Sequence, residues 1–169
     1  MRMSIELIEA PSPAVDPLEA LEAAAEGLSI SVERVDDDEL HLAIPGMWRD
    51  AGFWVTWRPE LSTLQMGAPL DIKAPAARLC EAARLVAMVN ERLWIGHFDL
   101  WTDDHSIVFR NSVVLPASGA LDPLQAEILI RGAREALDRF LPAFNFFIWG
   151  GKSPEEAMES SLFETQGNA

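Results

Sequence analysis

Two histidines and three aspartates crowd residues 97–105, and these side chains are the ones in this sequence most suited to chemistry. Imidazole nitrogens and carboxylate oxygens bind several divalent metal ions, so the stretch is a candidate metal-binding or enzymatic site. Its spacing matches no diagnostic metal motif, however, and adjacent aspartates such as Asp103 and Asp104 commonly form turns. We therefore predict a polar turn without metal or cofactor, and keep a metal site or enzyme at His97 to His105 as the alternative.

Two further candidates for chemistry fail on their details. Gly151, Lys152 and Ser153 resemble the end of a phosphate-binding loop, but the first glycine of that motif would fall at Phe146. Its side chain would keep the backbone amides from wrapping a phosphate. Cys80 has no neighbouring histidine in the sequence to activate it, so we expect a small buried residue within a helix. The sequence thus offers no catalytic residue, and we predict that the protein is not an enzyme.

A different kind of candidate comes from aromatic and charged residues that alternate with apolar ones along three predicted strands. Successive side chains of a strand point to opposite faces of a sheet. The face opposite the apolar set would carry Trp54, Arg58, His97, Asp99, Trp101 and Arg110. Tryptophan with arginine nearby is typical of binding hot spots, so we predict that this face binds a protein or peptide partner. The alternative is that the chain's own termini or a second subunit cover these tryptophans.

The helices that must support these strands are signalled by a capping residue followed by proline. Asp16-Pro17, Asp122-Pro123 and Ser153-Pro154 predict helices over residues 17–27, 123–149 and 154–162. Another helix is predicted to begin near Pro75 and to stop before Gly96, with an apolar stripe made of Leu79, Ala83, Val86, Val89 and Leu93. Inside the longest helix, Pro142 predicts a kink or a break.

Alternation with a period of two predicts six strands, at residues 28–35, 40–44, 53–58, 63–72, 98–101 and 107–115. Polar runs at 36–39 and 102–105 separate strand pairs as hairpin turns. Pro69 indicates a sheet edge or the end of a strand. The element order α-β-β-β-β-α-β-β-α-α predicts an α+β fold, in which an antiparallel sheet has helices packed on one face.

The domain organisation is predicted to be simple. Residues 16–163 form one domain, with a loose segment at 1–15 and a loose tail at 164–169. Phe140, Phe144 and Phe147 recur at helical spacing and form an apolar stripe. This stripe either belongs to the core or is shared with a second subunit, so a homodimer is possible.

Charge and composition narrow the class of partner. The net charge is −14, and residues 1–40 alone hold eleven acidic residues against two arginines. Such a field repels phosphate backbones, so we expect no nucleic-acid partner. No apolar run is long enough to cross a bilayer, no secretory signal is visible, and the single cysteine cannot form an internal disulfide. We therefore expect a cytoplasmic protein without membrane contact.

Four stretches together resemble the YbjN domain family: VNERLWIGHFDLW, IPGMWRDAGFWVTWRPEL, the Phe109-Arg110 pair and PAFNFFIWGGKSPEEA. The likeness covers about residues 15 to 162, and the last stretch resembles the alphaproteobacterial branch of the family. Members are described as bacterial sensory transduction regulators. Their fold is similar to that of type III secretion chaperones, small acidic α+β proteins that dimerise and hold partner segments. The resemblance implies a regulatory or chaperone-like binding module, and it brings no catalytic residue or cofactor.

Overall fold

The computed structural model describes residues 15–166, with side chains described as far as Phe163. Its helices and strands are α1 (Pro17–Gly27), β1 (Ser31–Arg34), β2 (Glu39–Ile44), β3 (Ala51–Arg58), β4 (Thr63–Lys73), α2 (Leu79–Asn90), β5 (His97–Leu100), β6 (Ser106–Val114), α3 (Pro123–Ile148) and α4 (Pro154–Gln166). Short 3₁₀ turns, η1 (Pro59–Leu61) and η2 (Ala76–Arg78), precede β4 and α2. The predicted α+β class and the order of elements are confirmed.

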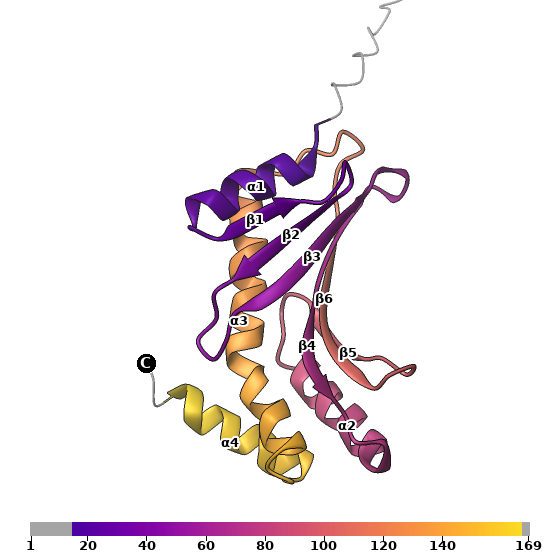
Figure 1. Ribbon diagram of the computed structural model, residues 1–169, viewed down its shortest axis with the longest axis vertical. Helices are drawn as coiled ribbons and strands as arrows, with labels where there is room; N and C mark the ends of the chain where they lie inside the picture. The colour runs from indigo at the N-terminus through magenta and orange to yellow at the C-terminus, as the bar shows by residue number, and fades with distance from the viewer. Residues whose placement is uncertain (1–14, 167–169) are drawn as a thin grey trace, which may run out of the picture.

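The strands form one antiparallel sheet in the order β1-β2-β3-β4-β6-β5. The long helix α3 runs behind this sheet, α1 crosses it near β1, and α2 and α4 lie at the opposite end (Figure 1). The side of the sheet that faces the reader in Figure 1 carries no helix, and we call it the outer face. Helices therefore pack on one face, as predicted. None of the helices within residues 15–166 is long and apolar enough to span a bilayer.

The inner face of the sheet is built from the residues that the period-two pattern selects. The buried hydrophobic residues of β2, β3 and β4 are Leu40, Leu42, Ile44, Phe53, Val55, Trp57, Leu64, Met66, Ala68, Leu70 and Ile72. The stripe of Phe140, Phe144 and Phe147 on α3 is also fully buried within the single chain, so these rings belong to its own core. Phe144 lies 5.0 Å from Phe98 of β5, measured between ring centroids.

Each of the three helix starts predicted from a capping residue has the expected cap. The fourth helix, α2, begins at Leu79 after the turn η2 and has no side-chain cap. The Asp16 carboxylate accepts a hydrogen bond from the Leu18 N–H at 2.9 Å, and Asp122 forms a capping box with Gln125. Ser153 and Glu156 bond reciprocally, each side chain accepting from the other's backbone N–H. These bonds satisfy amides that the first turn of a helix leaves without partners.

The ends of the chain differ in part from the predicted loose segments. Val15 is held in place because its N–H donates to the Ser118 carbonyl at 2.7 Å. The last helix, α4, continues to Gln166 instead of ending near 162, so 164–166 are helical. Residues 1–14 and 167–169 lie outside the described residues, and the prediction for them stays a prediction.

The helix α3 continues through Pro142, so of the predicted kink or break the break is absent. Proline has no N–H, so the carbonyl four residues earlier, that of Asp138, loses its helical partner. The indole N–H of Trp48, in the loop between β2 and β3, donates to this carbonyl at 2.7 Å. In addition, the Met47 N–H donates to the Asp138 carboxylate at 2.6 Å. The loop is therefore fastened to α3 at the point where proline removes a bond.

This arrangement predicts that Trp48 and Pro142 are energetically coupled. Trp48→Phe should lower the free energy of unfolding by about 1 kcal/mol, the usual contribution of one hydrogen bond. In a Pro142→Ala background the loss should be clearly smaller, because the helix then supplies its own N–H to the Asp138 carbonyl. Urea denaturation of the two single variants and the double variant measures the coupling. Equal losses in both backgrounds would contradict the bond.

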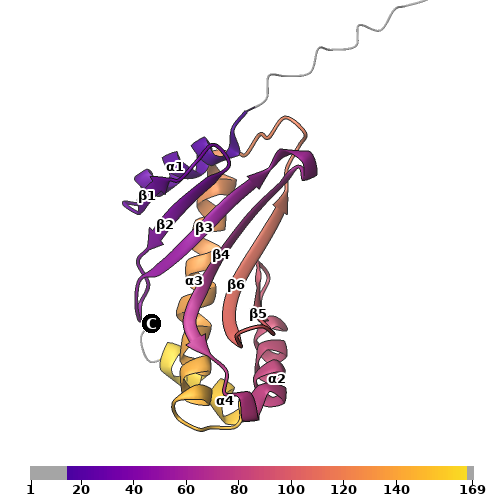
Figure 2. The same cartoon turned by 45° about the vertical axis from the view of Figure 1, so that its right-hand side comes forward.

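Pro69 lies inside β4 and not at its end, so the prediction of a strand end is wrong, but it lies where one side of β4 has become a local sheet edge. The pairing of β3 with β4 runs from Arg58–Thr63 to Trp54–Gly67 and stops there. Pro69 lies two residues further along β4, where β4 has no partner on the β3 side. The two strands diverge from this point (Figure 2). The missing N–H of proline therefore breaks no ladder bond.

Cys80 is exposed, so its predicted burial is wrong. The buried residues of α2 are Ala82, Leu85, Val86 and Val89. Cys80 and Ala83 lie outside this stripe, and the stripe is therefore rotated from the one predicted. The cause is the composition of α2. Small apolar residues occur on all sides of this helix, so its sequence does not identify a single buried face.

Candidate functional site

A row of five residues crosses the outer face from β2 to β5. His41, Trp54, Gly67, Arg110 and His97 are successive Cα partners on β2, β3, β4, β6 and β5. Three of the six predicted binding residues thus lie on one line across the sheet. The backbone pairing itself sets their relative positions.

The indole of Trp54 lies on the sheet, over Gly67 of the neighbouring strand. A Cβ atom added at Gly67 would lie 2.8 Å from Cε2 of this indole, so only glycine leaves room for the ring. Trp54 is half-buried as a result. A ring held in this way loses little conformational entropy when a partner covers it.

Asp99 links two of the other predicted residues. Its Oδ2 lies 3.0 Å from Nη1 of Arg110 and 3.5 Å from Nε2 of His97. The Arg110 charge is therefore paired within the chain. The three side chains remain partly exposed on the outer face.

Trp101 extends this cluster beyond the end of β5. Its backbone N–H donates to the Ser106 carbonyl at 2.8 Å, which continues the hairpin, and the residue is 45% exposed. Together with Asp99 and Arg110, Trp101 lines a shallow hollow of about 260 Å³. Both predicted tryptophans thus lie on the face that the helices leave uncovered.

Arg58 is the one predicted residue that the structure separates from the rest. It pairs with Thr63 at the far end of β3, four residues beyond Trp54. Four residues of a strand span roughly 13 Å. Its side chain is exposed and forms no ion pair within the part of the chain described. Arg58 is therefore available to an acceptor, but away from the cluster around Asp99.

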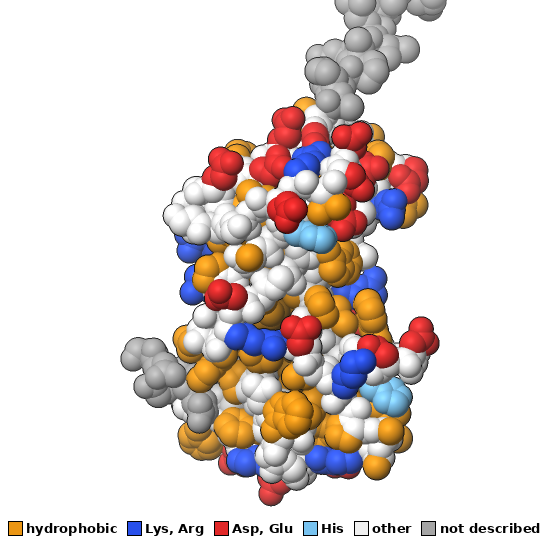
Figure 3. Space-filling view, viewed as in Figure 1, with side chains coloured by type: hydrophobic (Ala, Val, Ile, Leu, Met, Phe, Trp, Pro, Cys, Tyr) orange, Lys and Arg blue, Asp and Glu red, His pale blue; other side chains and the backbone are white. Residues whose placement is uncertain are grey.

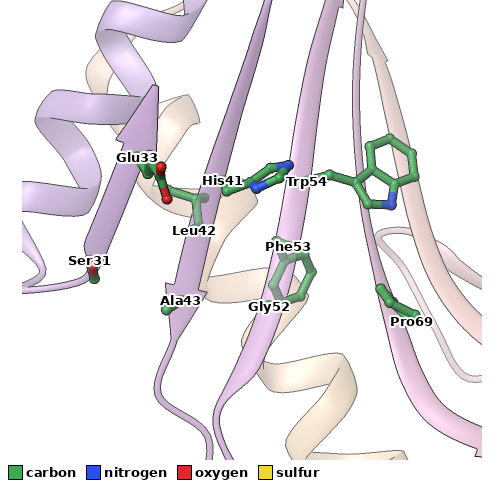
Figure 4. A pocket seen from close by; sticks show the side chains of 9 residues that line it. All are labelled: Ser31, Glu33, His41, Leu42, Ala43, Gly52, Phe53, Trp54 and Pro69. Carbon is green, nitrogen blue, oxygen red and sulfur yellow. The ribbon is translucent and has the colours of Figure 1, made fainter. Parts of the chain in front are cut away.

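A second hollow, of about 380 Å³, opens on the outer face where β4 diverges from β3. Small residues in neighbouring positions, Ser31, Ala43 and Gly52, leave this space. Trp54 and His41 line it as well, and so does Pro69 across the gap (Figure 4). The sequence did not predict this hollow, because it depends on strand divergence and on which small residues become neighbours across strands.

The charge around the outer face is uneven. Acidic side chains gather at the end of the molecule that carries α1, β1 and the β1–β2 turn (Figure 3). Asp36, Asp37 and Asp38 are all exposed in this turn, and Glu33 lines the larger hollow. A partner that reaches this hollow therefore meets a negative potential on one side.

The hairpin of residues 97–105, proposed above as an alternative metal site, is stabilised by its own polar contacts. Hydrogen bonds from the Ser106 hydroxyl, from the Lys73 ammonium and from the Ser106 backbone N–H lower the pKa of Asp104 to about 2. Within residues 15–163, no three His, Cys, Asp or Glu side chains lie close enough together to hold a metal ion. The alternative of a metal site at His97 to His105 thus lacks a ligand cluster among these residues.

The Gly-Lys-Ser stretch is likewise occupied by structural contacts. Nη2 of Arg78 donates to the Lys152 carbonyl at 2.8 Å, and Nη1 of Arg78 donates to the Phe147 carbonyl at 3.0 Å. The Lys152 ammonium donates to the Ser160 hydroxyl, and Ser153 caps α4. These contacts join the turn η2, which precedes α2, to the end of α3 and to α4.

Comparison with known proteins places the chain in a family. The family model YbjN, described as "Putative bacterial sensory transduction regulator", matches residues 17–146. The chain belongs to the YbjN family. Among solved structures, it is similar to the "Crystal structure of YbjN, a putative transcription regulator from E. coli", with a TM-score of 0.51 and 18% sequence identity. That similarity covers 75% of this chain and 90% of the E. coli chain, and it shows a shared YbjN fold. No curated protein matches the sequence significantly.

Proposed function

We propose that this YbjN-family chain is a non-enzymatic regulatory protein that binds a protein or peptide segment in a chaperone-like manner. The binding surface would be the outer face, with Trp54 and Trp101 as anchors. One observation carries the proposal: two indoles remain accessible on the sheet face that no helix covers, and one of them is held in position over Gly67. Tryptophans of this kind commonly contribute about 2 kcal/mol or more each to binding.

The site also favours a particular chemistry in the partner. The hollow beside Trp54 suits an apolar side chain, and Glu33 at its edge favours a nearby basic one. Further along β3, the exposed Arg58 can pair with an acidic group or a carbonyl. An extended segment with apolar and basic residues fits these features. The E. coli YbjN structure is described as that of a transcription regulator. For this chain, with a net charge of −14, we propose action through protein contact and not through nucleic acid.

Removing both anchors should abolish partner binding without unfolding the protein. We expect the Trp54→Ala/Trp101→Ala double variant to lose a partner that tagged wild-type chain captures from its native cell. With the isolated partner, the Kd should rise at least about 30-fold, which corresponds to about 2 kcal/mol. The circular dichroism spectrum should be unchanged, because neither ring lies in the core.

A matched control removes two exposed aromatic rings elsewhere. Trp149 and Phe163 are 75% and 69% exposed, so the Trp149→Ala/Phe163→Ala variant should capture the partner as the wild type does. Equal capture by both double variants would refute the proposal, and so would unfolding of Trp54→Ala/Trp101→Ala.

A further inference from the structure

The edge strand of the sheet covers only part of its neighbour. β5 pairs with β6 from Leu100–Ile107 to His97–Arg110, whereas the pairing of β6 with β4 continues to Val114. The Trp101 N–H bonds to the Ser106 carbonyl, so the backbone groups of Ser106 point toward β5. Backbone groups alternate in direction along a strand, and those of the other even-numbered residues of β6 therefore also point to this side. Beyond Arg110, these residues are Ser112 and Val114. Their N–H and C=O groups therefore point past the end of β5, toward an open edge.

This open edge contrasts with the edge of β5 itself, which the chain protects. The Asn90 side chain donates to the Phe98 carbonyl at 3.0 Å and accepts from the Phe98 N–H at 2.8 Å. Among residues 15–166, no loop or side chain bonds to the backbone of Ser112 or Val114. Unpaired backbone at a sheet edge is a site where another strand can add.

An apolar groove of about 340 Å³ runs between this edge and α3. Trp94, fully exposed, and Ile128, 45% exposed, are among the residues that line it. Asn111 also lines it, is 8% exposed, and its Nδ2 has no hydrogen-bond partner. A strand added at the edge would place alternate side chains in this groove. Both the unpaired backbone and the exposed apolar groups would then gain partners.

The position of Val15 indicates which segment can reach the groove. The Val15 N–H bonds to the Ser118 carbonyl, in the loop that joins β6 to α3. Val15, the first described residue, therefore lies near the end of the groove where β6 stops, and fourteen residues precede it in the sequence. Fourteen residues can span roughly 45 Å at about 3.3 Å each, whereas the edge from Asn111 to Val114 needs only about 13 Å. The segment is long enough to lie along this edge.

The sequence of this segment has the pattern of a strand. Met3, Ile5 and Leu7 alternate with Ser4 and Glu6, and Pro11 and Pro13 follow. We propose that residues 4–7 add to the open edge of β6 as a seventh strand, with Ile5 and Leu7 in the groove. Since the chain then continues to Val15 at the end where β6 stops, this strand runs parallel to β6. The segment would shield the edge from strands of other chains, independently of any partner on the outer face.

Hydrogen exchange of the full-length chain tests the proposal. The Ser112 and Val114 amides should be protected, and removal of residues 2–10 should increase their exchange rates at least tenfold. Leu7→Asp should have the same effect, because it places a charge in the apolar groove. Glu6→Gln, its matched control on the opposite side of the strand, should leave protection unchanged. The Phe98 amide, bonded to Asn90, should stay protected in every variant. Protection that is absent, or that survives the deletion, overturns the proposal.

Disulfide trapping identifies which copy of the segment binds. In a Cys80→Ser background, Leu7→Cys combined with Ile128→Cys should form a disulfide within one chain at low protein concentration. Leu7→Cys combined with Ser31→Cys, on the opposite edge of the sheet, should form none. A disulfide-linked dimer from the first pair would show that a second copy supplies the strand, and would overturn binding within one chain.

Discussion

Gly96→Ala is expected to lower the free energy of unfolding by about 2–4 kcal/mol, from backbone strain and overpacking together. Gly96 has a φ of +71°, in the left-handed region that side chains rarely adopt. An added Cβ would also lie 2.7 Å from Cε2 of Phe109 and 2.9 Å from the Arg110 carbonyl oxygen. The Phe109 ring cannot move away easily, because it is fully buried between other rings.

Two other glycines distinguish the effect of backbone strain from that of overpacking. Gly151 has a φ of +65° but nothing within 4 Å of an added Cβ, so Gly151→Ala should show only the strain, about 1 kcal/mol. Gly27 has neither a positive φ nor a close neighbour, and Gly27→Ala should leave stability nearly unchanged or slightly increased. Urea denaturation of the three variants gives the comparison. Similar losses at Gly96 and Gly151 would show that packing against Phe109 contributes little.

Phe109→Ala is expected to cost about 3–5 kcal/mol, the range for removing a large ring from a packed core. Phe109 lies at the centre of an edge-to-face cluster, with ring centroids 6.1 Å from Phe53 and 5.4 Å from Phe98. These contacts join β3, β5 and β6, which carry five of the six predicted binding residues. The variant should therefore loosen the sheet at its centre.

The matched control for Phe109→Ala is Phe163→Ala, since Phe163 is 69% exposed. Its free energy of unfolding should stay within about 0.5 kcal/mol of the wild-type value, as is usual for surface substitutions. Denaturant unfolding followed by circular dichroism measures both variants. A loss below about 2 kcal/mol for Phe109→Ala would mean that this ring does not hold the sheet together.

The stretch NERLWIGHFDLW is a structural corner between the groove beside β6 and the outer face. Asn90 protects the edge of β5, Gly96 turns the chain against Phe109, and Trp94 lines the groove beside β6. At its other end, Asp99 and Trp101 belong to the outer face. This corner therefore connects the groove beside β6 with the outer face.

Local patterns in the sequence determined the elements and the faces of the strands. The caps at Asp16, Asp122 and Ser153 act on amides two or three residues away, so the helix starts were visible without a structure. The alternation that places Trp54 and Trp101 opposite the core is equally local, since consecutive side chains of a strand always point to opposite faces. For the same reason, the order of elements was enough to predict an α+β fold with one covered face.

Only the tertiary structure decided how these residues meet. Arg110 pairs with Asp99, Arg58 lies apart, and Trp54 rests on Gly67 because of the register between strands, which the sequence does not display. Pro69 is tolerated in a central strand because β3 and β4 diverge beside it, and α3 survives Pro142 because Trp48 donates from a distant loop. The open edge of β6 exists because β5 begins only at His97, opposite Arg110, and leaves the rest of β6 without a partner on that side. Each of these features joins residues far apart in the chain, and such contacts are set by packing and pairing that no local pattern records.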